Sequence, residues 1–378
     1  MKRLITRLGR QRKAFTGALI LVIGLGILAI DHHRRWRIWL QITSVTKMHN
    51  MPVNTTGYTI EQLPFYFRSS FARGHDVYFA DGGGRVYKAD DRNPPSVAAQ
   101  LGNSQIPPRM LFVSSRGTIF ISGSKPPLVR SVDGGRTWEK SHDWSFWRMT
   151  EDEASHTLYA GNYSPQKHPF YMAKVFKSND EGKTWLTVFE DDQLDHIHSV
   201  LWDAKYNRLY ISAGDSRRRG QAYSQDNGVT WHWIKSGGKQ GHTDLAISDR
   251  YVLWGSDDNL GRVIRAPRSP VQDGETIVWE PYHHVWWVVA ENRQIYAGTL
   301  TGGGKRKYTG AFLLVSADEG ETWQKLLEDK DGGAALSVFN AESRRLSADG
   351  WLYCVTDSGT AYRIRRTPRA TGTADLPS

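Results

Sequence analysis

The sequence predicts an all-β protein, a seven-bladed β-propeller of four-stranded antiparallel blades, with an N-terminal transmembrane helix. Two observations predict the propeller. An eight-residue phrase recurs at a spacing of 46 or 47 residues, and short strand-like runs lie between its copies. A third observation predicts the helix, because the uncharged run 14–30 follows a basic N-terminal segment.

The repeated phrase has the pattern S-x-D-x-G-x-T-W. One spacing between its aspartates is 92 residues, which is twice the usual value. A degenerate copy of the phrase around Asp273 lies in the middle of that interval. Weaker traces near 87–91 and 362–365 extend the array to seven registers. A fixed period of this length indicates repeated supersecondary units. The aspartates of the four strong copies are Asp133, Asp180, Asp226 and Asp318.

Short apolar runs separate the copies, for example 209–214, 251–255 and 294–298. They are rich in β-branched and aromatic residues and are bounded by turn residues, which indicates strands in hairpins. Four short strands per repeat, repeated seven times, indicate a propeller. The last repeat lacks a fourth strand. We expect segment 54–60 to pair with 361–364 and close the ring, which leaves no open sheet edge.

The N-terminus predicts a membrane anchor. Residues 1–13 carry six basic side chains and are expected to be cytoplasmic, while 14–30 form a transmembrane signal-anchor. A cleaved signal peptide is the alternative interpretation. Residues 31–53 then form a juxtamembrane linker, 54–366 the propeller and 367–378 a disordered tail. This orientation places the propeller on the exported side, periplasmic or extracellular.

The net charge of +10 belongs mainly to this N-terminal region. Residues 1–40 hold nine Lys and Arg against one Asp, which leaves a net charge of +2 for the rest of the chain. We therefore expect no nucleic-acid partner. Because Cys354 is the single cysteine, the chain cannot form an internal disulfide. We expect Cys354 to be a small buried apolar residue of a strand.

The phrase resembles the Asp-box, or BNR repeat, of the sialidase-like β-propeller superfamily. The resemblance covers roughly residues 60–365 and implies that the repeated aspartates form structural turns on the outer part of the blades. The chain does not resemble a typical sialidase. Gln105-Ile106-Pro107 stands where a sialidase has Arg-Ile-Pro, and sialidases have six blades.

Propeller ligands usually lie at the axial mouth, among loops that precede the innermost strands and follow the second strands. Histidines precede the innermost strands of predicted blades four, five and six. The candidate catalytic residues are His196, His198, His242, Asp215, Asp244 and Asp258. The candidate substrate-binding residues are Arg109, Arg148, Arg217, Arg219, Arg262, Asn259, His284 and Tyr163.

Three interpretations of the histidines remain open. They could hold a divalent metal as the cofactor, with His198, His242 and His284 as candidate ligands. Histidine and aspartate could instead act as base and acid on a sugar. The third interpretation is structural, with histidines that cap strand ends and bond loop carbonyls.

Basic side chains gather on the same expected face and favour an anionic ligand. The sequence therefore predicts a membrane-anchored, exported Asp-box propeller that binds or cleaves an acidic glycan or polysaccharide. Cleavage would be hydrolysis by paired carboxylates or elimination beside a uronate, with histidine as the base. The alternative is a non-catalytic assembly or scaffold propeller with a protein partner, as in Asp-box propellers that resemble photosystem assembly factors.

Overall fold

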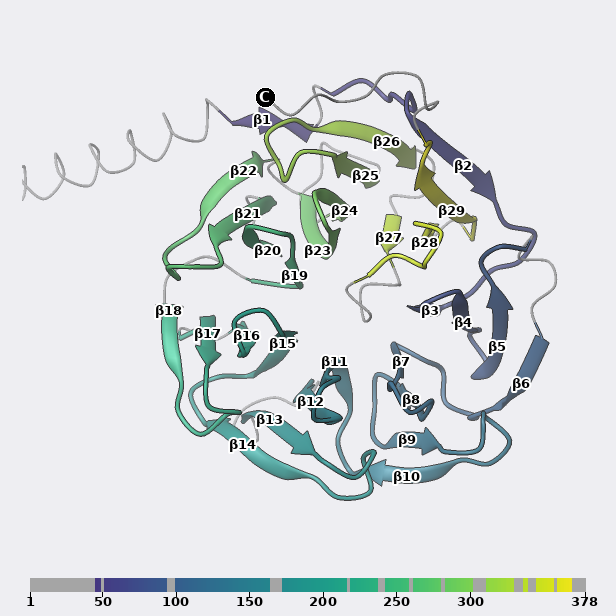
Figure 1. The fold of residues 1–378 in the computed structure, drawn as a ribbon, viewed down its shortest axis with the longest axis vertical. Coiled ribbons are helices and arrows are strands. Elements are labelled where there is room, and N and C mark those ends of the chain that lie inside the picture. The colour runs from purple at the N-terminus through teal and green to yellow at the C-terminus, as the bar shows by residue number, and fades with distance from the viewer. Residues whose placement is uncertain are drawn as a thin grey trace, which may run out of the picture. The chain divides into compact units, whose positions relative to one another are not determined.

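The computed structural model describes residues 45–48, 51–93, 99–163, 172–215, 218–236, 242–257, 261–279, 283–301, 311–329, 336–338, 345–356 and 359–368. The chain divides into two units, Met1–Thr46 and Lys47–Ser378, and the second unit contains the propeller. Seven antiparallel sheets surround one axis in this unit, as Figure 1 shows, so the predicted number of blades is confirmed.

The first three blades each use four consecutive strands, ordered from the axis outward. They are β3 (Ser69–Arg73), β4 (Asp76–Ala80), β5 (Arg85–Asp90) and β6 (Ala99–Asn103); β7 (Met110–Val113), β8 (Ile119–Ser122), β9 (Leu128–Ser131) and β10 (Glu139–His142); and β11 (Phe146–Asp152), β12 (Thr157–Asn162), β13 (Ala173–Ser178) and β14 (Leu186–Asp191).

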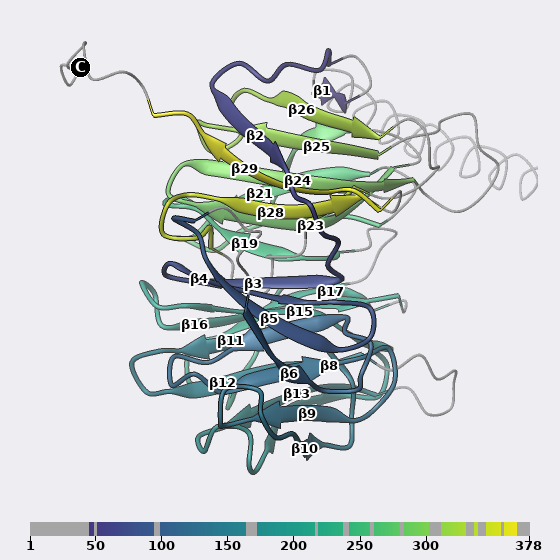
Figure 2. The same cartoon turned by 90° about the vertical axis from the view of Figure 1, so that its right-hand side faces the viewer.

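Blades four to six follow the same order. They are β15 (His196–Asp203), β16 (Arg208–Gly214), β17 (Gly220–Ser224) and β18 (His232–Ser236); β19 (Leu245–Ile247), β20 (Tyr251–Gly255), β21 (Arg262–Pro267) and β22 (Glu275–Trp279); and β23 (His283–Glu291), β24 (Gln294–Thr301), β25 (Ala311–Ser316) and β26 (Gln324–Asp329). The fifth sheet also includes β1 (Thr46–Lys47). The side view in Figure 2 shows inner strands such as β3 running from one face of the ring toward the other.

Blade seven closes the ring with strands from both ends of the propeller. Its strands are β27 (Leu336–Val338), β28 (Leu352–Thr356), β29 (Ala361–Arg366) and β2 (Tyr58–Gln62). Ile60 lies opposite Ile364, so the closing pairing predicted from the sequence is present, although its strand begins at Tyr58. The N-terminal strand covers the edge that β29 would otherwise expose.

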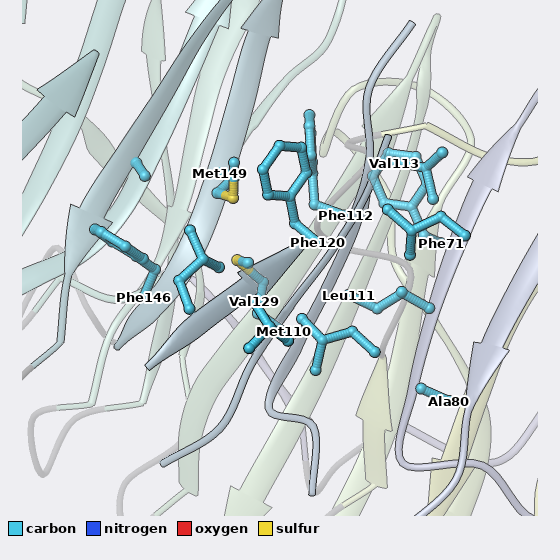
Figure 3. Close-up of a cluster of buried hydrophobic side chains, with 14 of the residues drawn as sticks. Phe71, Ala80, Met110, Leu111, Phe112, Val113, Phe120, Val129, Phe146 and Met149 are labelled. Atoms are coloured by element: carbon cyan, nitrogen blue, oxygen red, sulfur yellow. The ribbon is translucent and has the colours of Figure 1, made fainter. Parts of the chain in front are cut away.

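The core lies between neighbouring blades. All four residues of β7 are buried, because each inner strand has sheets packed against both of its faces. Phe71 of blade one meets Phe112 of blade two edge to face, with ring centroids 5.1 Å apart. Figure 3 shows these rings together with Met110, Phe120 and other apolar side chains of the same cluster.

The S-x-D-x-G-x-T-W phrase folds into one hydrogen-bonded turn, termed the repeated turn. In the copy at Asp133, Oδ1 accepts from the Ser131 hydroxyl at 2.8 Å and from the Thr137 amide at 2.9 Å. Oδ2 accepts from the Thr137 hydroxyl at 2.6 Å. Ser131 Oγ accepts from the Gly135 amide, and Gly135 has a φ of 92°, which favours glycine.

The same carboxylate bonds recur in the other three strong copies, at Asp180, Asp226 and Asp318. Each repeated turn joins the third strand of its blade to the fourth, on the outer part of the ring (Figure 1). The predicted position of these aspartates is therefore confirmed. Their short polar side chains replace backbone partners that a tight turn leaves unsatisfied.

The predicted basic segment 1–13 and transmembrane helix 14–30 lie outside the described residues. So do most of the linker 31–53 and residues 369–378 of the tail. Within the described part of the chain, no helix has the length and apolar character needed to cross a membrane. The anchor remains a prediction.

Candidate functional site

Two histidines begin the innermost strand of blade four. His196 pairs with Gly214 and Ile197 with Ala213, but the next pair is Ser199 with Ser212. His198 is thus the extra residue of a β-bulge, and a bulge re-aims the side chain that it carries. The two imidazoles lie together, with their Nε2 atoms 2.8 Å apart.

Hydrogen bonds determine how these imidazoles are oriented. His198 Nδ1 donates to the backbone carbonyl of His242, so Nε2 of neutral His198 has a lone pair. His196 Nε2 then donates to that lone pair. The His198 ring lies directly over Gly214, where an added Cβ would be 2.2 Å from His198 Cε1. Only glycine at position 214 leaves room for the ring.

Asp215 completes the polar part of the site. It follows β16 with a φ of 65°, a left-handed conformation that is uncommon for residues other than glycine. Its carboxylate oxygens lie 3.7 Å from His196 Nε2 and 4.0 Å from His198 Nε2. The histidines are buried, whereas the Asp215 side chain is about half exposed, so the group is open to solvent on the carboxylate side.

Aromatic rings line the same place. The Trp147 and Tyr163 ring centroids are 4.2 Å apart, and Tyr163 lies 4.5 Å from the His196 ring. Trp147 also contacts the His198 ring at 5.5 Å. These residues form the axial cluster: Trp147, Tyr163, His196, His198 and Asp215.

Trp147 and Trp286 show that the cluster lies at the axis of the ring. Each is skipped in the pairing of its innermost strand, as His198 is, so blades three, four and six carry equivalent bulges. The two indole centroids are 5.8 Å apart. Blades three and six are not neighbours, so these side chains can meet only across the axis. The bulges therefore turn large side chains into the channel and narrow it.

A positively charged side chain, Arg109, lies beside the pair formed by Trp147 and Tyr163. The Arg109 guanidinium lies 5.8 Å from the centre of the Trp147 ring. Arg109 directly precedes β7 of blade two, so four blades contribute side chains around this mouth. Guanidinium groups bind carboxylates with two parallel hydrogen bonds, which suits a ligand bearing an acid group.

Burial and neighbouring charges set the protonation of the cluster. Burial, followed by repulsion from His198, holds the pKa of His196 well below the ordinary value, so His196 is neutral at neutral pH. Burial raises the pKa of Tyr163, Arg109 opposes that rise, and Asp215 adds to it. The cluster therefore presents a neutral imidazole and a protonated phenol beside the Asp215 carboxylate.

Arg148 and Asp244, predicted for substrate binding and catalysis, form a buried ion pair inside the ring. Arg148 Nε lies 3.2 Å from Asp244 Oδ1. Asp244 also accepts from the Ser199 hydroxyl at 3.1 Å and from the Val288 amide at 3.4 Å. The carboxylate thus connects residues of blades three, four and six, and the binding and catalytic roles of Arg148 and Asp244 stay predictions.

The other candidates are more scattered. His242 is buried with its ring 6.0 Å from Trp254, and its carbonyl orients His198. His284 is half-buried near Trp286, with ring centroids 6.4 Å apart. Arg262 is buried and Arg219 is half-buried. Residues outside the described part of the chain are Arg217, Asp258 and Asn259.

The structure changes the grouping of the metal candidates. His198 gathers with His196 and Asp215, with ligand atoms all within 4.8 Å of one another. Within the described ranges, that group does not include His242 or His284. The three residues that do come together were all predicted as catalytic candidates, and that role stays a prediction.

Trp147 and Trp286 were not among the candidate site residues, although the position of Trp147, directly before Arg148, was expected at the mouth. Trp286 begins the apolar run 286–290, which indicates a strand and not a binding position. A bulge becomes visible only when the pairing partner of each strand is known. The one hint for Trp286 in the sequence is that it lies two residues after His284, which was predicted to line the mouth.

A separate cavity of about 210 Å³ lies at the opposite ends of the innermost strands. It is lined by Arg73, Glu151, Glu153 and Trp202, among others. Glu151 and Trp202 are near the ends of β11 and β15, whereas Trp147 and His198 are near their beginnings. The cavity is thus remote from the axial cluster.

The fold defines the class of protein as a seven-bladed β-propeller. No family model matches the chain, and no curated protein matches its sequence. Solved structures with a similar fold include a GH74 enzyme from Niastella koreensis, at 16% identity and a TM-score of 0.50, covering 71% of this chain and 46% of that one. This chain therefore spans less than half the length of that enzyme.

Two further structures match over nearly their whole length. An oligogalacturonate lyase from Vibrio parahaemolyticus is 13% identical with a TM-score of 0.55, covering 85% of this chain and 96% of that one. YCF48 from Cyanidioschyzon merolae is 13% identical with a TM-score of 0.52, covering 81% and 98%. At these identities the likeness shows the fold alone. Propellers of this shape thus include both carbohydrate-active enzymes and other proteins.

Proposed function

We propose that this chain is a membrane-anchored, exported Asp-box propeller whose axial mouth binds an acidic glycan. The observation that carries the proposal is the pairing of Trp147 with Tyr163 at 4.2 Å, with the Arg109 guanidinium 5.8 Å from the Trp147 ring. An aromatic surface beside a cation offers a sugar acid both an apolar contact and a partner for its carboxylate.

The tryptophan contact across the axis supports this use. Trp147 and Trp286 meet across the axis at 5.8 Å, so a ligand at the mouth rests on aromatic rings. Binding sites of this kind are mostly apolar, with a few polar groups that orient the ligand. Here the polar groups beside the rings are Arg109, His196 and Asp215.

Cleavage would use the neutral imidazole. A general base must be unprotonated at the working pH, and burial keeps His196 in that form by lowering its pKa. In an elimination beside a uronate, the base takes the proton next to the carboxylate, the bond to the leaving sugar oxygen breaks, and that oxygen takes up a proton from water or from the protonated base. The products are an unsaturated sugar and a new free hydroxyl.

The test is binding of the full-length chain, in detergent, to a polyuronate and to a neutral polysaccharide. We expect preferential binding of the polyuronate, weakened by salt. Arg109→Ala should weaken it about tenfold or more, because the ligand carboxylate loses a charged hydrogen-bond partner. Arg136→Ala, on an exposed repeated turn, removes the same charge elsewhere and should change nothing.

Equal binding of both polysaccharides, or equal affinity of wild type and Arg109→Ala, would contradict the proposal and favour a protein-binding scaffold. Ultraviolet absorbance of an unsaturated product after incubation would show elimination. A His196→Ala variant that still binds the polyuronate, with affinity reduced less than in Arg109→Ala, but forms no product would assign the base.

The anchor is part of the proposal and rests on the uncharged run 14–30 behind six basic residues. The chain should remain in the membrane pellet after an alkaline wash. Protease added from the exported side should reach the propeller. Release of an intact chain by the wash would contradict the anchor without affecting the glycan site.

A further inference from the structure

We infer that His196, His198 and Asp215 form a binding site for a divalent transition-metal ion. Their ligand atoms lie within 4.8 Å of one another at the axial mouth. Two imidazole nitrogens and one carboxylate are a donor set that first-row transition ions favour, whereas Mg²⁺ and Ca²⁺ prefer oxygen ligands. The inference does not depend on glycan binding, since metal binding can be measured alone.

The surroundings of His198 hold it in the form that binds metal. Its Nδ1 donates to the His242 carbonyl, which leaves the Nε2 lone pair directed toward His196 and Asp215. A ligating histidine commonly donates its other ring nitrogen to a backbone carbonyl in this way. The bulge at His198 and the missing Cβ at Gly214 place the ring within the group.

The spacing needs only a small adjustment. The two Nε2 atoms are 2.8 Å apart, whereas two ligands at zinc–nitrogen distances would be separated by about 3.3 Å in a tetrahedral arrangement. Asp215 approaches from the exposed side, so its carboxylate can move toward the ion. His196 would carry its hydrogen on Nδ1 and not on Nε2, a change of tautomer without a change of charge.

The position of the group leaves part of the coordination sphere open. Three protein ligands with a solvent-facing fourth position are typical of sites that also bind a substrate or a water molecule. Tyr163 lies 4.5 Å from the His196 ring, and Trp147 lies 5.5 Å from the His198 ring. An ion here would therefore meet a ligand held against the aromatic pair.

A second group of potential ligands is less suitable. His75, Asp91 and Asp349 also lie within 4.8 Å of one another, between blades one and seven. There His75 Nδ1 already bonds Asp91 Oδ1 at 2.7 Å, and Asp91 Oδ2 accepts from the Asp349 amide at 2.8 Å. The Asp91 carboxylate is thus engaged on both oxygens, which makes this group a structural contact.

The experiment is calorimetric titration of Zn²⁺ into the full-length chain in detergent, stripped of metal and carrying no histidine tag. We expect one strong site per chain and no measurable heat with Mg²⁺. Asp215→Asn should weaken the site about tenfold or more, because it removes the anionic ligand. Asparagine tolerates the left-handed backbone at position 215, so the fold should be preserved.

The double variant His196→Ala/His198→Ala should lose the site, while Asp249→Asn, an exposed carboxylate outside the cluster, should retain it. Absorption of bound Co²⁺ gives a second readout, since its ligand-field bands should change in Asp215→Asn. Unchanged Zn²⁺ affinity in Asp215→Asn or the double variant would overturn the inference. So would loss of the site in His75→Ala, or an absence of Zn²⁺ binding by the folded wild type.

Failure of this inference is distinguishable from failure of the proposed function. Polyuronate binding by metal-stripped protein, with its dependence on Arg109, is measured without Zn²⁺. A chain that binds the polyuronate but not Zn²⁺ loses only the metal site. A chain that binds Zn²⁺ at the histidines but no polyuronate loses only the glycan proposal.

Discussion

The repeated turns and the axial residues occupy equivalent places in successive blades, yet they differ in how far they repeat. The repeated turn keeps the same hydrogen bonds around Asp133, Asp180, Asp226 and Asp318. The bulged axial position holds Trp147 in blade three, His198 in blade four and Trp286 in blade six. Residues that repeat support the fold of the blades that carry them, and residues that vary at an equivalent position are available for a site.

The repeated turns and the axial cluster also differ in which ionisation state of their side chains they stabilise. The repeated turn surrounds its carboxylate with donors, and the Thr230 hydroxyl and amide lower the pKa of Asp226 to about 2. The axial cluster instead buries its imidazole, and burial lowers the pKa of His196 by penalising the charged form. The turns thus stay ionised for structure, whereas the cluster keeps a neutral nitrogen that can accept a proton or bind a metal.

The largest expected effect tests whether the axial ion pair is structural. Asp244→Ala should destabilise the fold by about 3–5 kcal/mol, because Arg148 is left buried without its carboxylate. Chemical denaturation followed by tryptophan fluorescence measures this. Asp244→Asn keeps the shape of the side chain and should cost less. A small loss of stability combined with loss of polyuronate binding would instead support the roles predicted from the sequence.

The next effect concerns the tryptophan that ends a repeated turn. Trp185 stacks on Phe146 with centroids 6.0 Å apart but is only half-buried. Trp185→Ala should therefore cost about 2–3 kcal/mol, below the 3–5 kcal/mol of a fully buried ring. Its exposed neighbour offers the control, since Leu186→Ala should stay within about 0.5 kcal/mol of wild type. Equal losses of stability in Trp185→Ala and Leu186→Ala would contradict a structural role for the Trp185 ring.

A smaller loss of stability is expected from a change at the axis, where Gly214 positions the His198 ring. Gly214→Ala places a Cβ 2.2 Å from His198 Cε1 and should cost about 1–3 kcal/mol as the ring moves. Zn²⁺ affinity should fall by about tenfold or more, as expected when support for a ligand is lost. Gly82→Ala, with no atom within 4 Å of the added Cβ, serves as the control. Retained affinity in Gly214→Ala would mean that His198 is not positioned by this contact.

The smallest effect is a pH dependence of the repeated turn. Because the folded state lowers the pKa of Asp226 to about 2, below its unfolded value of about 3.9, its stabilisation is present above that unfolded value. It is lost as the pH falls through the folded value. The melting temperatures of wild type and Asp226→Asn should therefore converge between about pH 4 and pH 2. A constant gap for Asp226→Asn across this pH range would contradict the ionised turn.

Several features of this protein follow from local sequence. The 46-residue spacing of the repeated turn predicts the seven blades, because a fixed period indicates repeated units, and each strong copy joins the third strand of its blade to the fourth. The missing last strand predicts the pairing of β2 with β29, since an open edge would leave backbone groups unpaired. The histidines at the start of predicted blades four, five and six predict a site at the axial mouth, because equivalent positions in a repeat lie on one face of the ring.

The tertiary structure alone decides which side chains meet. Trp147 and Trp286 contact each other across the axis, although 139 positions separate them in the chain. His198 turns toward His196 because of a bulge and because Gly214 has no Cβ, while Asp244 is committed to Arg148 of blade three. These contacts depend on strand register and on closure of the ring. Repeats encode the blade, and the site arises where the blades differ and their inner ends converge.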